Sequence, residues 1–134
     1  MLSKEIKNLM GNLEIRTALD RHWEFTGKDI DRSHEIYCDD VVVEFPQSGE
    51  RILGKQNIYE LRKHYPATLG FKILRTRGEG SLWVTEYIIT YDGSPVNVVC
   101  IMEFRDNKIA HETLYFGDPF EPPEWRSKWV ERTD

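Results

Sequence analysis

The sequence predicts an α+β fold, a curved antiparallel sheet with helices on one face. Two observations predict it. Helical spacing of apolar residues is confined to the chain before residue 66, whereas residues 71–117 alternate like strands separated by hairpin turns. Separate helical and strand regions are typical of α+β domains. A curved sheet of this kind can close over its helices like a cone and leave a pocket inside.

Three helices are predicted from apolar residues at helical spacing. Residues 1–11 are expected to be an N-terminal extension, a short or frayed helical lead-in, because Gly11 interrupts the pattern. The first full helix then ends at Gly27, a position where glycine is favoured. The helices are expected over residues 13–26, 30–37 and 54–66.

Two short strands and a meander of four long strands are predicted. The segments "EGS", "YDGSP" and "RDNK" separate the long strands, and each is a hairpin signal. The expected strands are residues 41–46, 51–53, 71–78, 81–91, 95–105 and 108–117. A C-terminal tail follows over residues 119–134, in which Trp125 and Trp129 lie four residues apart. We expect these two tryptophans to pack on the sheet or on a second subunit.

The composition bounds the class of protein. A chain of 134 residues is predicted to be a single domain, 1–134. The 18 lysines and arginines are fewer than the 23 aspartates and glutamates, so we expect no nucleic-acid partner. No apolar run approaches the roughly 20 residues of a membrane-spanning helix, so we expect no membrane partner.

Cofactor and metal signatures are absent from the sequence. It contains no phosphate-binding glycine motif, and Cys38 and Cys100 do not have the spacing of metal ligands. We therefore expect no cofactor and no metal. Two free thiols are typical of a reducing compartment, which predicts a cytoplasmic protein.

Three segments resemble a known superfamily. The stretches "GKDIDRSHEIYCDDVVVEFP", "RILGKQNIYEL" and "MEFRDNKIAHETLYFGDPF" resemble the nuclear transport factor 2-like superfamily, in its SnoaL-like and ketosteroid-isomerase-like branch. The resemblance covers about residues 12–120 and implies a cone-shaped curved sheet wrapped around the N-terminal helices, a cystatin-like α+β barrel. The superfamily includes isomerases, polyketide cyclases, epoxide hydrolases, dehydratases and proteins that only bind or dimerise, so the resemblance implies no single activity.

The groups that the isomerase pattern requires are missing. That pattern ends its first strand in an aspartate before a proline, and Phe45 stands at this position before Pro46. Glu44 is one residue away, which turns its side chain to the other face of the strand. Met102 occupies the place of the protonated aspartate that stabilises the enolate. We therefore do not expect the ketosteroid isomerase mechanism.

The resemblance also implies which side chains line a pocket. Alternation along the strands turns one set of residues inward, and the third helix is expected to contribute Leu61 and either Arg62 or Tyr65. The expected ligand-binding residues are Phe45, Leu61, Trp83, Thr85, Tyr87, Met102, Leu114 and Phe116. A cavity of this apolar and aromatic character suits a small hydrophobic molecule that carries a carbonyl group.

Glu112, on the last strand, is the first predicted catalytic residue. In one register its carboxylate lies among apolar side chains, where the loss of hydration favours the neutral acid and suits a general acid or base. In the register shifted by one residue, His111 and Thr113 face inward and Glu112 is solvated. The sequence leaves both registers open.

His22 is the second predicted catalytic residue. It lies on the helix face that includes Ile15 and Leu19, where it would orient Glu112 or bind a substrate carbonyl. The alternative is a core histidine with one satisfied ring nitrogen.

Two functions remain open on the sequence. One is a proton-shuttle isomerase, cyclase or dehydratase, and the other is a non-catalytic ligand-binding or dimerisation module. Val99 and Ile101 on the outer face of the meander suit a homodimer formed through the sheet.

Overall fold

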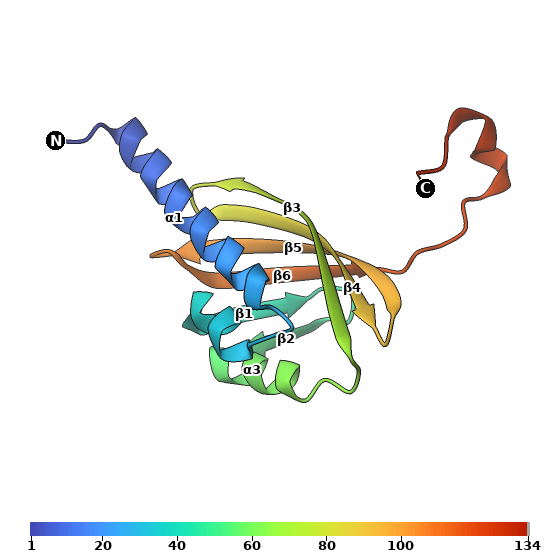
Figure 1. Cartoon of the computed structure of the whole chain (residues 1–134), viewed down its shortest axis with the longest axis horizontal. Coiled ribbons are helices and arrows are strands. Elements are labelled where there is room, and N and C mark those ends of the chain that lie inside the picture. The colour runs from blue at the N-terminus through green and yellow to red at the C-terminus, as the bar shows by residue number, and fades with distance from the viewer. Residues whose placement is uncertain (134) are drawn as a thin grey trace.

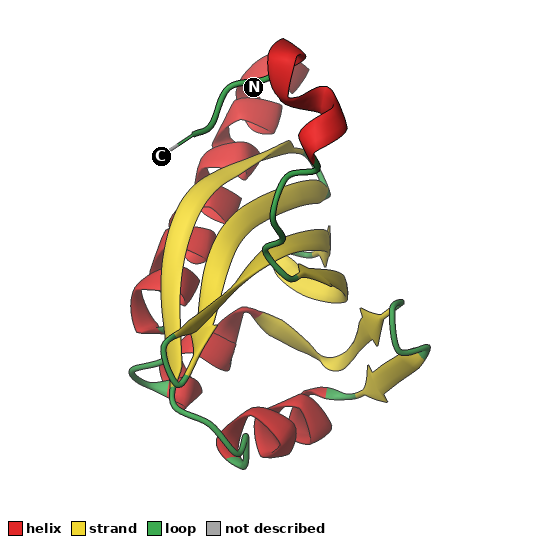
Figure 2. Cartoon of the chain, turned by 90° about the vertical axis from the view of Figure 1, so that its right-hand side faces the viewer, coloured by secondary structure: helices red, strands yellow, loops and turns green. Residues whose placement is uncertain are grey.

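A six-stranded curved sheet organises the protein, and helices cover its concave face (Figures 1 and 2). The computed structural model describes residues 1–133. The strand order is β2-β1-β6-β5-β4-β3, and the sheet does not close into a barrel. All neighbouring strands are antiparallel except β1 and β6, which pair in parallel. The predicted α+β class is confirmed, with this one parallel pair inside the expected antiparallel sheet.

The strands follow the predicted meander. Their bounds are β1 Tyr37–Phe45, β2 Glu50–Leu53, β3 Leu69–Glu79, β4 Leu82–Tyr91, β5 Ser94–Arg105 and β6 Lys108–Gly117. Two tight hairpins join β4 to β5 and β5 to β6. Asp92 and Gly93 have positive φ in the first, and Asp106 and Asn107 have positive φ in the second. Positive φ at both central residues is the geometry that two-residue hairpins prefer.

The predicted break at Gly11 is wrong, because α1 runs without interruption over Lys4–Phe25. The Ser3 hydroxyl oxygen caps the helix by accepting a hydrogen bond from the Ile6 amide at 3.2 Å. Within a helix of 22 residues, one glycine costs only about 1 kcal/mol, which the neighbouring turns offset. Asn12 lies within the helix, where its side-chain oxygen accepts a hydrogen bond from the Gly80 amide at 2.8 Å.

The second predicted helix is shorter than expected and divides in two. The segment forms α2 over Ile30–Ser33 and a 3₁₀ turn, η1, over His34–Ile36. As a result β1 begins at Tyr37, four residues before the predicted start at residue 41. The third helix, α3, spans Lys55–Lys63. Both α2 and η1 pack against α1, whereas α3 packs against β1 and β2 and lies below α1 in Figure 1.

The C-terminal half of α1 forms the core with the concave face of the sheet. Ile15 and Leu19 of α1 are buried against inward-facing strand residues such as Val98 and Met102. Along β4 the burial alternates with every second residue, which is the pattern of a strand with one covered face. Among residues 1–133 no helix is long and apolar enough to cross a membrane.

The chain after β6 leaves the body of the protein (Figure 1). Within residues 118–133 the regular element is a 3₁₀ helix, η2, over Glu124–Trp129. Trp125 and Trp129 are both exposed, so they do not pack on the sheet of their own chain. Their packing on a second subunit stays a prediction.

Candidate functional site

Glu112 lies on the concave face of the sheet. Its side chain is 1% exposed and belongs to the wall of a cavity. The neighbouring His111 lies on the opposite face, where its Nε2 is 3.4 Å from Glu44 and its Nδ1 is 2.7 Å from Glu103. The strand therefore has the register in which the acid at position 112 points inward and Glu44 points outward.

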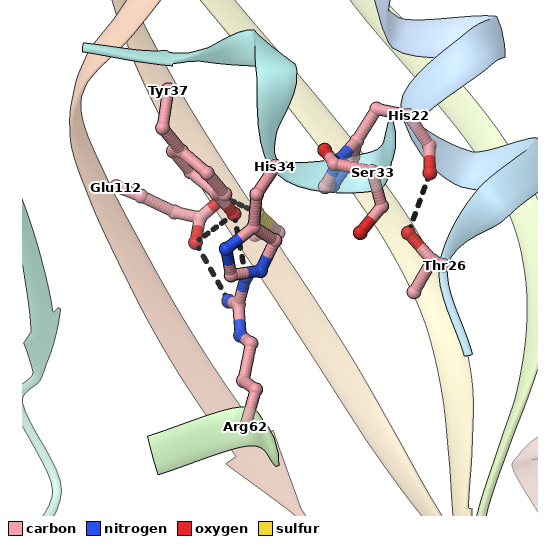
Figure 3. Close-up of polar contacts among 8 residues, drawn as sticks. His22, Thr26, Ser33, His34, Tyr37, Arg62 and Glu112 are labelled. Carbon is pink, nitrogen blue, oxygen red and sulfur yellow. Dashed lines mark hydrogen bonds and ion pairs between the residues drawn. The ribbon is translucent and has the colours of Figure 1, made fainter. Parts of the chain in front are cut away.

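Three donor groups surround the Glu112 carboxylate, two of which, from Tyr37 and Arg62, are labelled in Figure 3. The Tyr37 hydroxyl lies 3.1 Å from Oε1 and 3.0 Å from Oε2. The Arg62 guanidinium donates to Oε2 at 3.2 Å and forms an ion pair with it. The Cys100 thiol lies 3.3 Å from Oε1. The carboxylate is therefore buried but fully hydrogen-bonded, which offsets the cost of removing it from water.

Arg62 connects three elements of the site. From α3 its Nη1 donates to the Tyr37 hydroxyl at 2.8 Å and to His34 Nε2 at 3.1 Å, while Nη2 holds Glu112. Burial disfavours its charged form, but neighbouring Tyr37 and Glu112 outweigh that effect and raise the pKa of Arg62 above its ordinary value. The side chain is 27% exposed, so it lies between the cavity and the solvent.

The other two donors to Glu112, the Tyr37 hydroxyl and the Cys100 thiol, remain protonated. Burial raises the pKa of Tyr37 well above its ordinary value, and the same cause raises the pKa of Cys100, with Glu112 adding to it. Tyr37 therefore remains a donor to the carboxylate. Cys100 is not a nucleophile, because a reactive cysteine needs a lowered pKa.

His22 is neutral, and one tautomer of its ring is fixed. Its Nδ1 lies 2.6 Å from the Ser33 carbonyl oxygen, which can only accept, so Nδ1 carries the proton. Burial lowers the pKa of His22, although Ser33 and Glu112 oppose that effect. Nε2 consequently keeps its lone pair, and no residue in the described part of the chain donates a hydrogen bond to it. His22 lines the cavity.

His34 has the same tautomer as His22, with the proton on Nδ1. Because Arg62 can only donate, His34 Nε2 is an acceptor and the ring is neutral. Burial, followed by the nearby Arg62 charge, lowers the pKa of His34 to about 3. Its Nδ1 is buried without a hydrogen-bond partner among residues 1–133.

The cavity has a volume of about 390 Å³ and lies between α1, α2, α3 and the sheet. That volume is within the usual range of about 300–1,000 Å³ for small-molecule sites. Most of its walls are apolar or aromatic. The predicted site residues that line it are His22, Phe45, Leu61, Tyr87, Glu112, Leu114 and Phe116.

Three predicted ligand-binding residues lie in the packed core rather than along the cavity. The Thr85 hydroxyl accepts a hydrogen bond from Trp23 Nε1 at 3.2 Å, so α1 covers it. The Trp83 indole donates to the Gly80 carbonyl at 3.0 Å, and Met102 is fully buried. All three face inward as predicted, but α1 fills the space above them.

Sequence reasoning missed two members of the site, Tyr37 and His34. Both lie where the predicted helix over residues 30–37 gives way to η1 and β1, so their directions could not be assigned. Arg62 was considered with Tyr65 as a pocket residue of the third helix. Its signal is the spacing from buried Ile58, four residues earlier on the same helix face.

No group of three potential metal ligands occurs among residues 1–133.

The comparisons with known proteins agree on one family. A model of the SnoaL-like domain matches residues 16–112. A solved NTF2-like protein of unknown function from Burkholderia xenovorans LB400 is 52% identical, with a TM-score of 0.86, over 93% of this chain and 99% of that chain. No curated protein matches the chain.

Two more distant structures share the fold. A proposed ketosteroid isomerase from Kribbella flavida DSM 17836 is 22% identical, with a TM-score of 0.83, over 92% of each chain. A proposed polyketide cyclase from Sinorhizobium meliloti is 20% identical, with a TM-score of 0.63, over 74% of this chain and 94% of that chain. The domain model and the Burkholderia structure together show that this chain belongs to the SnoaL-like family of the nuclear transport factor 2-like superfamily.

Proposed function

We propose that the cavity binds a small, mostly apolar carbonyl compound and that the protein moves a proton on it, as an isomerase, cyclase or dehydratase. The observation that carries the proposal is the buried Glu112 carboxylate, held by Tyr37 and Arg62 in the wall of an otherwise apolar cavity. Buried charged groups in clefts are typical of functional sites. The two distant relatives with enzyme names share only the fold with this chain.

His22 is the proton acceptor in this proposal. Its Nε2 has an open lone pair, whereas donors already occupy the oxygens of Glu112. Burial lowers the pKa of His22, and the negative charge of Glu112 opposes that effect, so it favours the imidazolium that forms when Nε2 takes a proton. Glu112 thus assists the transfer through its charge, and Ser33 fixes the tautomer.

The carbonyl oxygen of the substrate needs a hydrogen-bond donor. Tyr87 lines the cavity, and burial raises its pKa well above the ordinary value, so its hydroxyl keeps the proton. In the proposed step, a proton leaves the carbon next to the carbonyl for His22 Nε2. The electron pair moves into the carbonyl, giving an enolate that Tyr87 stabilises, and His22 then returns the proton to carbon.

The test is deuterium exchange into a panel of cyclic ketones and enones in D₂O, with cyclohexanone as the first probe, followed by proton NMR. We expect the wild-type protein to accelerate exchange next to the carbonyl. His22→Gln should lower the rate by about 100-fold or more, the contribution typical of a general base. Glu112→Gln should also lower it, while exposed His64→Gln and Glu103→Gln serve as matched controls.

One observation favours a second function, a ligand-binding module without catalysis. The Glu112 carboxylate is so completely hydrogen-bonded that it would also serve as a structural link between β1, β6 and α3. In that case the panel would bind, as seen by saturation-transfer NMR, without any exchange above the buffer rate. Binding without exchange would overturn the catalytic proposal and support the module.

A further inference from the structure

The first half of α1 carries an apolar face that its own chain does not cover. We define the helix stripe as the exposed apolar residues Leu2, Ile6, Leu9, Met10 and Leu13. Leu2 lies just before the helix begins at Lys4, and Ile6, the pair Leu9 and Met10, and Leu13 recur every three to four residues, which places them along one side of the helix. At about 100° per residue, the core-facing residues Ile15, Leu19 and His22 lie roughly 160° around the helix axis from the helix stripe. The helix stripe therefore faces away from its own sheet.

A second uncovered apolar surface lies at the other end of the chain. We define the C-terminal arm as residues 118–133, whose exposed apolar residues are Phe120, Trp125, Trp129 and Val130. Trp125 is 74% exposed and Trp129 is 69% exposed. Tryptophan contributes strongly to interfaces but is rarely left in water over most of its surface.

The geometry of the arm directs it away from its own helix stripe. The N-terminal part of α1 and the arm lie at opposite ends of the molecule's longest axis (Figure 1). Three prolines, Pro119, Pro122 and Pro123, stiffen the arm, and Pro123 has the extended φ of −69° and ψ of 141°. Proline-rich segments of this conformation act as semi-rigid spacers.

The charges beside the two apolar surfaces are complementary. Lys4 and Lys7 lie on the turns that carry the helix stripe, and Glu5 is the one acidic residue among them. The first half of the arm contains Asp118, Glu121 and Glu124 and no basic residue, whereas the second half is mainly basic, so the complementary charges lie in the first half. Neither lysine takes part in an ion pair within residues 1–133. An arm laid along the helix stripe would bring these opposite charges together.

The area available matches that of a stable dimer. Burying three aromatic side chains that expose roughly 150–250 Å² each when free would remove about 350–550 Å² per arm from water. With a similar area on each helix stripe, two arms and two stripes would bury about 1,400–2,200 Å². A standard protein interface buries about 1,600 Å².

We propose that the C-terminal arm of one copy of this chain packs on the helix stripe of a second copy, and that the second copy returns the same contact. Such an exchange is symmetric and closes at two chains. It covers both apolar surfaces at once. It is independent of the chemistry proposed for the cavity, because neither surface contributes a residue to the cavity wall.

The test measures the mass of the full chain by sedimentation equilibrium from low to high micromolar concentration. We expect a two-chain mass for the wild type. Leu9→Asp and Trp129→Ala should each weaken self-association about tenfold or more. The double variant should weaken it no more than about the larger single effect, because both substitutions remove the same contact. Leu53→Asp is the matched control, since Leu53 is 57% exposed and Leu9 is 60% exposed.

Two results would overturn the proposal. A single-chain mass throughout the concentration range would show that no second copy binds. The second result is a dimer that persists in Leu9→Asp and Trp129→Ala but dissociates in Val99→Asp. It would assign the contact to the outer face of the sheet instead. Circular dichroism and thermal unfolding of each variant separate loss of association from loss of fold, because all the substituted residues are exposed.

Discussion

Replacing Arg62 by methionine tests the network around Glu112. The substitution removes the guanidinium from a carboxylate that is 1% exposed, and it leaves His34 Nε2 and the Tyr37 hydroxyl without their donor. Removing one partner of a buried pair costs about 3–5 kcal/mol. Because Arg62 is 27% exposed, we discount this figure and expect a loss of about 2–4 kcal/mol in the free energy of unfolding.

Urea denaturation of a double-mutant cycle isolates the ion pair. Arg62→Met, Glu112→Gln and the double variant should give a coupling energy of about 2 kcal/mol, since the double variant no longer contains an unpaired buried charge. The control cycle uses Arg105→Met and Asp40→Asn, a pair whose side chains are both mainly exposed. Its coupling should be below about 1 kcal/mol. A coupling for the buried pair no larger than that of the control would refute this description of the site.

Three further predictions concern stability. His34 has a pKa lowered to about 3 from 6.5, so the unfolded chain binds the proton first. The contribution of neutral His34 to the free energy of unfolding is complete above about pH 6.5 and falls by up to about 1.4 kcal/mol per pH unit toward pH 3. Urea titrations at several pH values should therefore show a slope of stability against pH that is smaller for His34→Gln, by the contribution of one proton. Thr85→Val takes the acceptor from Trp23 Nε1 and should cost about 1–2 kcal/mol in urea denaturation without changing probe binding. Gly11→Ala should raise the free energy of unfolding by about 1 kcal/mol, because a Cβ at this position meets no atom within 4 Å. Gly78→Ala should lower it, because its Cβ would lie 2.4 Å from the Leu82 carbonyl oxygen. Thermal unfolding measures both effects.

Strand alternation is the part of the site that sequence predicts best. The last strand has Glu112 and Leu114 inward and Tyr115 outward, as the first of the two registers requires. The same alternation placed Phe45 on the concave face and Glu44 on the convex face. A period of two residues fixes the face of every side chain once one residue is assigned, so this information is local.

Whether an inward-facing residue lines the cavity or packs beneath a helix depends on distant parts of the chain, so sequence predicts it poorly. Trp83, Thr85 and Met102 face inward, but whether an inward residue meets a cavity or a helix depends on where α1 crosses the sheet. That crossing is set by contacts such as Trp23 with Thr85, between residues 62 positions apart. Tertiary contacts of this length leave no periodic trace in the sequence.

Element boundaries account for the other differences. A glycine at position 11 weakens a helix by an amount that 22 residues easily offset, so the predicted break did not form. Tyr37 was assigned to the end of a helix and is in fact the first residue of β1. A boundary error of this size hid two of the three residues, Tyr37, His34 and Cys100, whose side chains hydrogen-bond to Glu112 or Arg62.

The most direct test of the proposed chemistry is nitrogen NMR of the His22 ring at pH 7, assigned by comparison with His22→Gln among the chain's four histidines. A neutral His22 with the proton on Nδ1 and an unprotonated Nε2 is expected, and the Nε2 resonance should shift when cyclohexanone fills the cavity. An imidazolium, a proton on Nε2, or an Nε2 signal indifferent to the ligand would contradict the assignment of His22 as the proton acceptor.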